Sequence, residues 1–331
     1  MKMKKQWIIL VLVIISLMFF LNSVSAEKKI VVGVSCVNKD NQWWATVGNF
    51  VEQSADVLGC EVIILWANAD QEKQVKDIED LIQRKVDVIL MAPVQKEGSS
   101  VAIEEAYAAG IPVVLFVRRT ADSSMDKVAA GVLHDYVSFG VKQAQQVAKD
   151  FPNGANIVYL LGPLGATYAM DQYDLGFTVE LKKYPNLKLI ETYHSPTDTS
   201  AEGMKLTEDA LVRFDNVDAI CCPNDDLALG AIRAAESAGK LDKIKIYGNS
   251  GVIPGLQAVY DGKMAFTEME SQSQVAFGGL ETAVKVVKGE TVPKEVLLEA
   301  EVITKANVLL IKDAVFGGTI ANPETFKPKT E

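Results

Sequence analysis

Short apolar segments alternate with longer amphipathic segments along almost the whole chain after residue 29. Residues 30–35 (IVVGVS) form a near-continuous apolar run, as is typical of a parallel strand that is buried on both faces. Residues 42–58 carry apolar side chains at helical spacing and are followed by Gly59, a residue common just beyond helix ends. The pattern predicts strands, separated by helices, at 30–35, 61–67, 87–92, 111–116, 127–133, 156–161, 187–193, 217–222, 243–247 and 264–269.

Strands that alternate with helices in this way indicate βαβ units and parallel sheets. The ten predicted strands fall into two successive runs of five, with no low-complexity linker between the runs. We therefore predict an α/β fold with two doubly wound, Rossmann-like lobes. Ligands of open parallel sheets bind beyond the carboxyl ends of the strands, so the loops that follow the strands are the candidate sites.

The first 26 residues have the features of an export signal. Three lysines lie in residues 1–6, an apolar run follows at 7–21, and the small residues Val24 and Ala26 come next. The run is shorter than the roughly 20 residues that a membrane span needs. We expect cleavage after Ala26 and a periplasmic or otherwise extracytoplasmic protein of about 305 residues, a length that suits two domains.

The charge of the chain argues against two classes of partner. The formal net charge is −10, and it becomes about −13 without the three signal lysines. Nucleic acids and anionic membrane surfaces are bound by basic patches, so we expect neither as a partner.

Two adjacent tryptophans are the most informative feature of the first loop. Asn41 precedes Trp43 and Trp44 by two and three residues, at the predicted start of a helix. Aromatic faces suit the C–H faces of a sugar ring or polyol, and also a cation. The alternative is that the rings pack in the core. Because neighbouring residues point about 100° apart on a helix, one ring could be in the core and the other in a cleft.

Arg118 and Arg119 follow the predicted strand 111–116. An arginine side chain offers five hydrogen-bond donors in a fixed fork, which suits neighbouring hydroxyls or a carboxylate. We expect Arg118 in the cleft and Arg119 in surface ion pairs.

Polar residues in later loops have two interpretations each. Asn224 and Asp171 lie at helix starts, where they could cap the helix or contact a ligand. Tyr173 lies in the same first turns as Asp171, whereas Ser250 and Glu270 follow late strands, where they could equally be turn residues.

The sequence lacks the motifs of common catalytic, metal-binding and phosphate-binding sites. It has only two histidines, no G-x-S-x-G nucleophile motif, and no G-K-[ST] ending on its glycine-containing loop at 162–167. We therefore expect a protein that is not an enzyme, with no cofactor and no metal.

Several segments resemble one known family. Residues 223–232 (PNDDLALGAI), the strand 111–114 (IPVV) that leads to Arg118, and residues 279–283 (GLETA) resemble the ribose-binding type of periplasmic solute-binding protein, the type I binding proteins of sugar ABC transporters. The resemblance extends from about Lys29 to Asn307.

The resemblance implies two lobes joined by three crossovers, near Asp135, Met269 and Val302. The first lobe would comprise 27–134 with 270–302, and the second 135–269 with 303–331. A ligand would bind between the lobes and cause them to close. The implied cleft residues are Trp43, Trp44, Arg118, Asp135 and Asn224, with Tyr173, Ser250 and Glu270 less certainly aligned.

The implied partners are a small sugar or polyol and the membrane permease of an ABC transporter, with the binding protein itself a monomer. A second possibility is a ligand-sensing subunit, for a sugar or an autoinducer-2-like signal, that acts on a chemoreceptor or a histidine kinase.

The sequence departs from the ribose-binding pattern at four positions. Val117 replaces an aspartate, Tyr173 an arginine, Ser250 an aspartate and Glu270 a glutamine. Such changes redistribute hydrogen-bond donors and acceptors, so we do not expect plain ribose. Another pentose, a polyol, a small furanone or a cationic ligand remain open.

Overall fold

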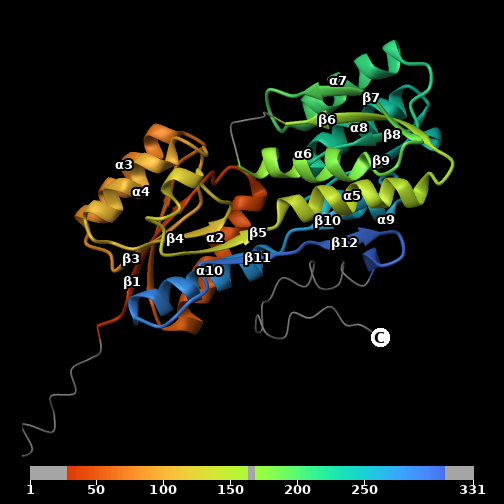
Figure 1. Cartoon of the computed structure of the whole chain (residues 1–331). Coiled ribbons are helices and arrows are strands. Elements are labelled where there is room, and N and C mark those ends of the chain that lie inside the picture. The colour runs from red at the N-terminus through yellow and green to blue at the C-terminus, as the bar shows by residue number, and fades with distance from the viewer. Residues whose placement is uncertain (1–27, 163–167, 310–331) are drawn as a thin grey trace, which may run out of the picture.

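The computed structural model describes residues 28–162 and 168–309, which form two α/β lobes side by side (Figure 1). The export signal predicted at 1–26, the loop 163–167 and the tail from residue 310 lie outside the described residues. Within the described ranges, no helix has the length and apolar character that crossing a membrane requires.

The first lobe is built on a six-stranded parallel sheet with the order β11-β5-β4-β3-β1-β2. Helices α2 and α10 cover one face of this sheet, and α3 and α4 cover the other. Its elements are β1 (Val31–Cys36), α2 (Gln42–Leu58), β2 (Glu61–Trp66), α3 (Gln71–Gln83), β3 (Val88–Met91), α4 (Ser99–Ala108), β4 (Val113–Val117), a 3₁₀ turn (Asp122–Ser124), β5 (Ala130–His134), α10 (Gln272–Val287) and β11 (Glu295–Leu298).

The second lobe has a six-stranded sheet with the order β12-β10-β9-β8-β6-β7, parallel except for β12. Helices α5 and α6 cover one face, and α7, α8 and α9 the other. Its elements are α5 (Tyr136–Asp150), β6 (Ala155–Leu161), α6 (Tyr168–Leu181), β7 (Leu187–His194), α7 (Ser200–Arg213), β8 (Ala219–Cys221), α8 (Asp225–Ser237), a 3₁₀ turn (Leu241–Lys243), β9 (Lys245–Tyr247), α9 (Ile253–Tyr260), β10 (Phe266–Met269) and β12 (Glu301–Thr304).

The predicted fold class, two doubly wound α/β lobes, is confirmed. The sixth strand of each sheet was not predicted, because β11 and β12 are only four residues long and begin with a glutamate. Both lie partly exposed at the edge of a sheet, so neither has the continuous apolar run of a central strand.

The chain passes between the lobes three times. It leaves the first sheet after β5 at Asp135, returns after β10 at Glu270, and crosses again between β11 and β12 at Glu299 and Ala300. The third crossing lies earlier than Val302, the position that the family resemblance implied, because Val302 already pairs with Glu268 in the second sheet.

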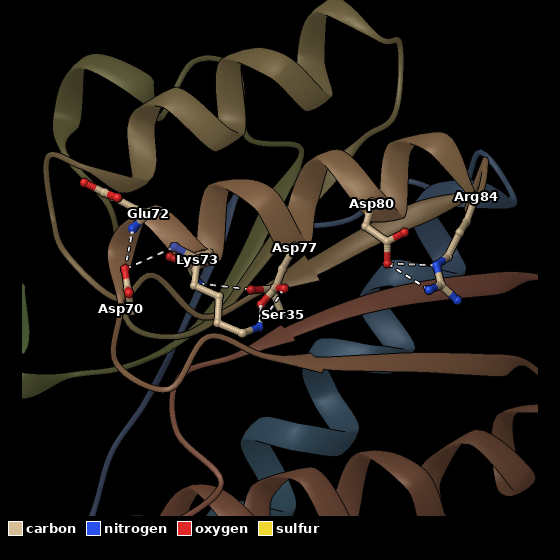
Figure 2. Close-up of polar contacts among 8 residues, drawn as sticks. Ser35, Asp70, Glu72, Lys73, Asp77, Asp80 and Arg84 are labelled. Atoms are coloured by element: carbon tan, nitrogen blue, oxygen red, sulfur yellow. Dashed lines mark hydrogen bonds and ion pairs between the residues drawn. The ribbon is translucent and has the colours of Figure 1, made fainter.

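Helix α3 illustrates how the sequence fixes each element locally (Figure 2). The Asp70 carboxylate caps the helix by accepting a hydrogen bond from the Lys73 amide (3.1 Å), and Lys73 pairs with Asp77 one turn later (2.8 Å). The buried Gln74 amide donates to the Ser35 hydroxyl (3.1 Å), which ties α3 to the carboxyl end of β1.

Helices α5 and α6 cross so closely that glycine is required at the contact. A Cβ atom at Gly176 would lie 2.1 Å from the Val137 carbonyl oxygen, and one at Gly140 would lie 2.2 Å from the Tyr173 carbonyl oxygen. Both obstacles are backbone atoms, which cannot rotate away as a side chain can. This close contact fixes α6 against α5, the helix that begins where the chain first passes between the lobes.

We expect Gly176→Ala to lower the free energy of unfolding by about 1–3 kcal/mol, because the added methyl group forces the helices apart. Gly278→Ala is the matched control, since a Cβ there meets only one Val132 side-chain atom at 3.3 Å. The control should be neutral, or more stable by up to about 1 kcal/mol because alanine favours the helix. Urea unfolding followed by circular dichroism measures both, and equal stability of the two variants would contradict the prediction.

Candidate ligand-binding site

The two tryptophans have different environments at the start of α2. Asn41 is exposed, and its side-chain oxygen accepts a hydrogen bond from the Trp44 amide (3.1 Å), which caps the helix. Trp44 is 6% exposed and packs in the core of the first lobe. Trp43 is half-buried and meets Trp44 edge-on, with ring centroids 5.0 Å apart. Trp44 is thus a core residue, whereas Trp43 is only partly buried and packs against the edge of that core.

Arg118 is directed by a tight turn in the backbone. Val117 has φ +69°, and the Arg118 amide donates to the Phe116 carbonyl oxygen (2.8 Å). A positive φ is unusual for a β-branched residue and indicates strain. The turn brings the Arg118 guanidinium over the Trp44 ring, 5.0 Å from its centroid, where the buried Nε has no hydrogen-bond partner in the part of the chain described.

Arg119 points to different groups. Its guanidinium pairs with Glu295 (2.7 Å) and Asp122 (2.5 Å) and lies 5.7 Å from the Tyr168 ring centroid. The expectation that Arg119 would form ion pairs is confirmed.

The first crossing contributes an aromatic group that the sequence did not reveal as part of a site. His134, the last residue of β5, is 3% exposed and packs edge-on against Trp43, with ring centroids 6.1 Å apart. Tyr136 lies on its other side (5.9 Å between centroids). Asp135, between these two residues, is half-buried and caps α5 by accepting from the Ser138 amide (3.0 Å).

Glu270 forms the second crossing and faces the same region. It is 7% exposed and accepts a hydrogen bond from the Asn249 side-chain amide (3.2 Å). Burial raises the pKa of Glu270 to about 7, although the charge of Arg118 and the bond from Asn249 lower it. The charge of Arg118 acts on Glu270, which shows that these two side chains lie near each other although they follow strands of different lobes.

Asn224 and Asp198 complete the second-lobe wall. The Asn224 side-chain oxygen accepts from the Leu227 amide (2.8 Å) and so caps α8. Although the Asp198 side chain reaches solvent, surrounding protein raises its pKa, while the charge of Arg118 and a hydrogen bond from Asn224 lower it. Asp198, in the loop after β7, was not predicted as a site residue.

Three other predicted residues lie beside or behind this cluster. Tyr173 is only 1% exposed and packs with Tyr136 in a buried group behind the site. Asp171 forms an ion pair with Lys96 of the first lobe (2.9 Å). Ser250 has φ +112° and its amide donates to the Glu268 carbonyl oxygen (2.8 Å), so its backbone joins β9 to β10.

Two further acids lie buried beneath the second-lobe wall. Asp225 accepts hydrogen bonds from the Thr267 hydroxyl (2.7 Å) and the Val252 amide (3.0 Å), and burial raises its pKa to about 8. Burial also raises the pKa of Glu268 well above its usual range. No three His, Cys, Asp or Glu side chains within the described ranges are grouped so that they could hold a metal ion.

The arrangement defines a class of protein: two α/β lobes, linked by three crossings, with aromatic and charged side chains of both lobes converging between them. The comparisons with known proteins agree. Residues 32–291 match the model of the periplasmic binding protein domain, and the chain belongs to this family.

The relatives of this chain are binding proteins. It is 30% identical to the ribose import binding protein of Haemophilus influenzae, over 86% of this chain and 94% of that protein. It is also 30% identical to the xylitol-binding protein of Mycolicibacterium smegmatis, over 74% of this chain and 69% of that protein. Its structure matches that of an ABC transporter solute-binding protein from Bacillus halodurans with bound myo-inositol, with a TM-score of 0.81 and 26% identity, over 87% of this chain and 99% of that one.

The raised pKa of Glu270 predicts how stability varies with pH. The folded protein holds this proton up to about pH 7, whereas the unfolded chain releases it near pH 4.3. Ionising Glu270 therefore opposes folding, and the free energy of unfolding should fall as the pH rises from about 4 to about 7 and then change little through this residue. The contribution of this residue is at most about 4 kcal/mol, because one pKa unit corresponds to about 1.4 kcal/mol.

Glu270→Gln keeps the bond from Asn249 but cannot ionise, so we expect a flatter dependence on pH. Urea unfolding of both proteins at pH 5, 6, 7 and 8, without ligand, measures the difference. Besides burial, the charge of Glu270 also raises the pKa of Asp225 and of Glu268, so the comparison measures Glu270 together with its effect on these two acids. Parallel curves for the two proteins would show that Glu270 has no raised pKa.

Proposed function

We propose that this protein captures a small, neutral polyhydroxy compound, a sugar or a polyol, between its two closing lobes. The observation that carries the proposal is the placement of Arg118. Its guanidinium lies over Trp44 in the first lobe and couples electrostatically to Glu270 and Asp198 of the second. The Arg118 guanidinium, with an unpaired donor, lies over Trp44, whose ring meets that of Trp43 edge-on. This arginine is suited to hold hydroxyl groups while the Trp43 ring contacts the C–H face of the ligand.

Closure of the lobes explains how binding is signalled. The ligand contacts both walls only when the lobes are together, so it favours the closed form by its difference in affinity for the two forms. The segments at Asp135, Glu270 and Glu299 act as the hinge. The closed form presents a combined surface of the two lobes to a partner.

The partner that we propose is the permease of an ABC transporter. The names of the relatives support this choice, because they include an import binding protein and an ABC transporter solute-binding protein. The protein acts as a monomer outside the cytoplasm, after removal of the signal at 1–26, and it releases its ligand chemically unchanged rather than acting as an enzyme. Ligand-dependent binding to a chemoreceptor or a histidine kinase instead of a permease would overturn the transport role.

Arg118→Ala should weaken ligand binding by about 10- to 100-fold, because each hydrogen bond from a charged donor contributes about 1.5–3 kcal/mol. A thermal-shift screen of the signal-free protein with pentoses, hexoses and polyols measures binding, since saturating ligand stabilises the folded form by a few kcal/mol. Arg84→Ala is the control, because Arg84 lies on α3 and pairs only with Asp80 among the residues described. A ligand-induced shift that Arg118→Ala leaves intact would contradict the proposed site.

The ion pair between Lys96 and Asp171 joins the lobes and should favour closure. We expect Lys96→Asp to weaken ligand binding at least about twofold. The substitution removes an ion pair worth up to about 1 kcal/mol and places two negative charges opposite each other. The double variant Lys96→Asp with Asp171→Lys should recover most of the affinity by restoring the pair. Titration calorimetry with the ligand found in the screen tests both. Failure of the double variant to recover would contradict the role of this ion pair in closure.

A further inference from the structure

His134 lies at the base of the site, where the chain first passes from one lobe to the other. Its ring is enclosed by three aromatic rings: Trp43 of the first lobe, and Tyr136 and Phe139 of α5. The ring centroids are 6.1, 5.9 and 5.8 Å away, respectively. The imidazole therefore contacts side chains of both lobes, at the point where the chain first passes between them.

Neither ring nitrogen of His134 has a hydrogen-bond partner among the described residues, although both atoms are buried. A buried polar atom left without a partner costs about 1–3 kcal/mol. Three neighbouring groups of the site share this condition: Trp43 Nε1, Arg118 Nε and Asn249 Oδ1. Other unpaired buried atoms lie elsewhere among the described residues, but the set formed by His134, Trp43, Arg118 and Asn249 draws on loops of both lobes.

The protonation state of His134 decides what these atoms can bind. Burial, together with the positive charge of Arg118, lowers its pKa to about 3. A neutral imidazole has one N–H donor and one nitrogen acceptor. The unpaired set therefore contains donors, on Trp43, Arg118 and His134, and acceptors, on His134 and Asn249.

A hydroxyl group both donates and accepts, so a ligand with several hydroxyls can satisfy donors and acceptors alike. A carboxylate or phosphate offers only acceptors and would leave the acceptor nitrogen of His134 and the Asn249 oxygen unpaired. An ammonium group offers only donors and would leave the Trp43 and Arg118 donors unpaired.

We propose that His134 binds the ligand directly and selects it: its neutral ring exchanges hydrogen bonds with hydroxyl groups, which favours uncharged polyhydroxy compounds over acids and amines. This inference rests on the proposed function and adds to it a binding residue and a chemical reason for the ligand class.

The competing interpretation is that His134 only fills space among aromatic rings. His134→Phe separates the two, because phenylalanine keeps an aromatic ring at this position but has no ring nitrogens. If His134 binds hydroxyls, His134→Phe should weaken binding by about 10- to 100-fold, as expected for the loss of one or two hydrogen bonds of about 1–1.5 kcal/mol each. The ligand-free variant should be as stable as the original protein or more stable, because two unpaired buried atoms are removed.

His134→Gln should recover part of the affinity, since an amide also carries a donor and an acceptor. His194→Gln is the matched control, because His194 lies exposed at the end of β7 and should leave binding unchanged.

Titration calorimetry with ribose, xylitol and myo-inositol, and with gluconate and glucosamine as charged probes, tests the inference. Binding of a neutral probe that His134→Phe weakens and His134→Gln partly restores is the expected result. Binding of a neutral probe that His134→Phe leaves unchanged would overturn the role of His134 while the proposed function stands. Binding of gluconate or glucosamine alone, or of none of the five probes, would overturn the ligand class and with it both proposals.

Discussion

Parallel strands joined by helices force all their carboxyl ends to one edge of the sheet, and both lobes of this protein direct that edge toward the other lobe. Every part of the candidate site depends on this constraint. Trp43 follows β1, Arg118 follows β4, Asn224 follows β8, Asn249 follows β9 and Glu270 follows β10. The crossings leave from the same edges, and the hinge and the site are therefore built from neighbouring residues.

Two of these strand ends have a strained backbone that positions the neighbouring side chains. Val117 and Ser250 both have positive φ angles, a conformation that costs about 1–3 kcal/mol for such residues. The strain is held by backbone hydrogen bonds, from Arg118 to Phe116 in one lobe and from Ser250 to Glu268 in the other. A side chain placed in this way loses little conformational freedom on binding, so more of its interaction energy appears as affinity.

The sequence allowed the fold to be predicted because the central strands are continuous apolar runs, which only a sheet covered on both faces can bury. It could not reveal β11 and β12. Each has only four residues, and each is a strand only because it pairs with a neighbour, β11 with β5 and β12 with β10. Trp43 and Arg118 were predicted as site residues because their chemistry is unusual for a loop. His134 was not predicted because it ends an apolar strand like any other residue, and the lack of partners for its nitrogens is a tertiary property with no local signal. The same holds for Asp198, whose position depends on the folding of the second lobe.

The balance of charge at the site favours a neutral ligand. Formally, the second-lobe wall and the residues beneath it carry many acids, but burial raises the pKa of Asp225 and Glu268 above neutral pH and that of Glu270 to about 7, so the wall carries less negative charge than its acids suggest. The positive charge of Arg118 is in turn opposed by Asp198. A carboxylate ligand would have to compete with Asp198 for Arg118, and an ammonium ligand would bind well only after Glu270 had lost its proton. A polyhydroxy compound needs no such change, because the side chains that enclose it already hold the protons that hydroxyl groups require.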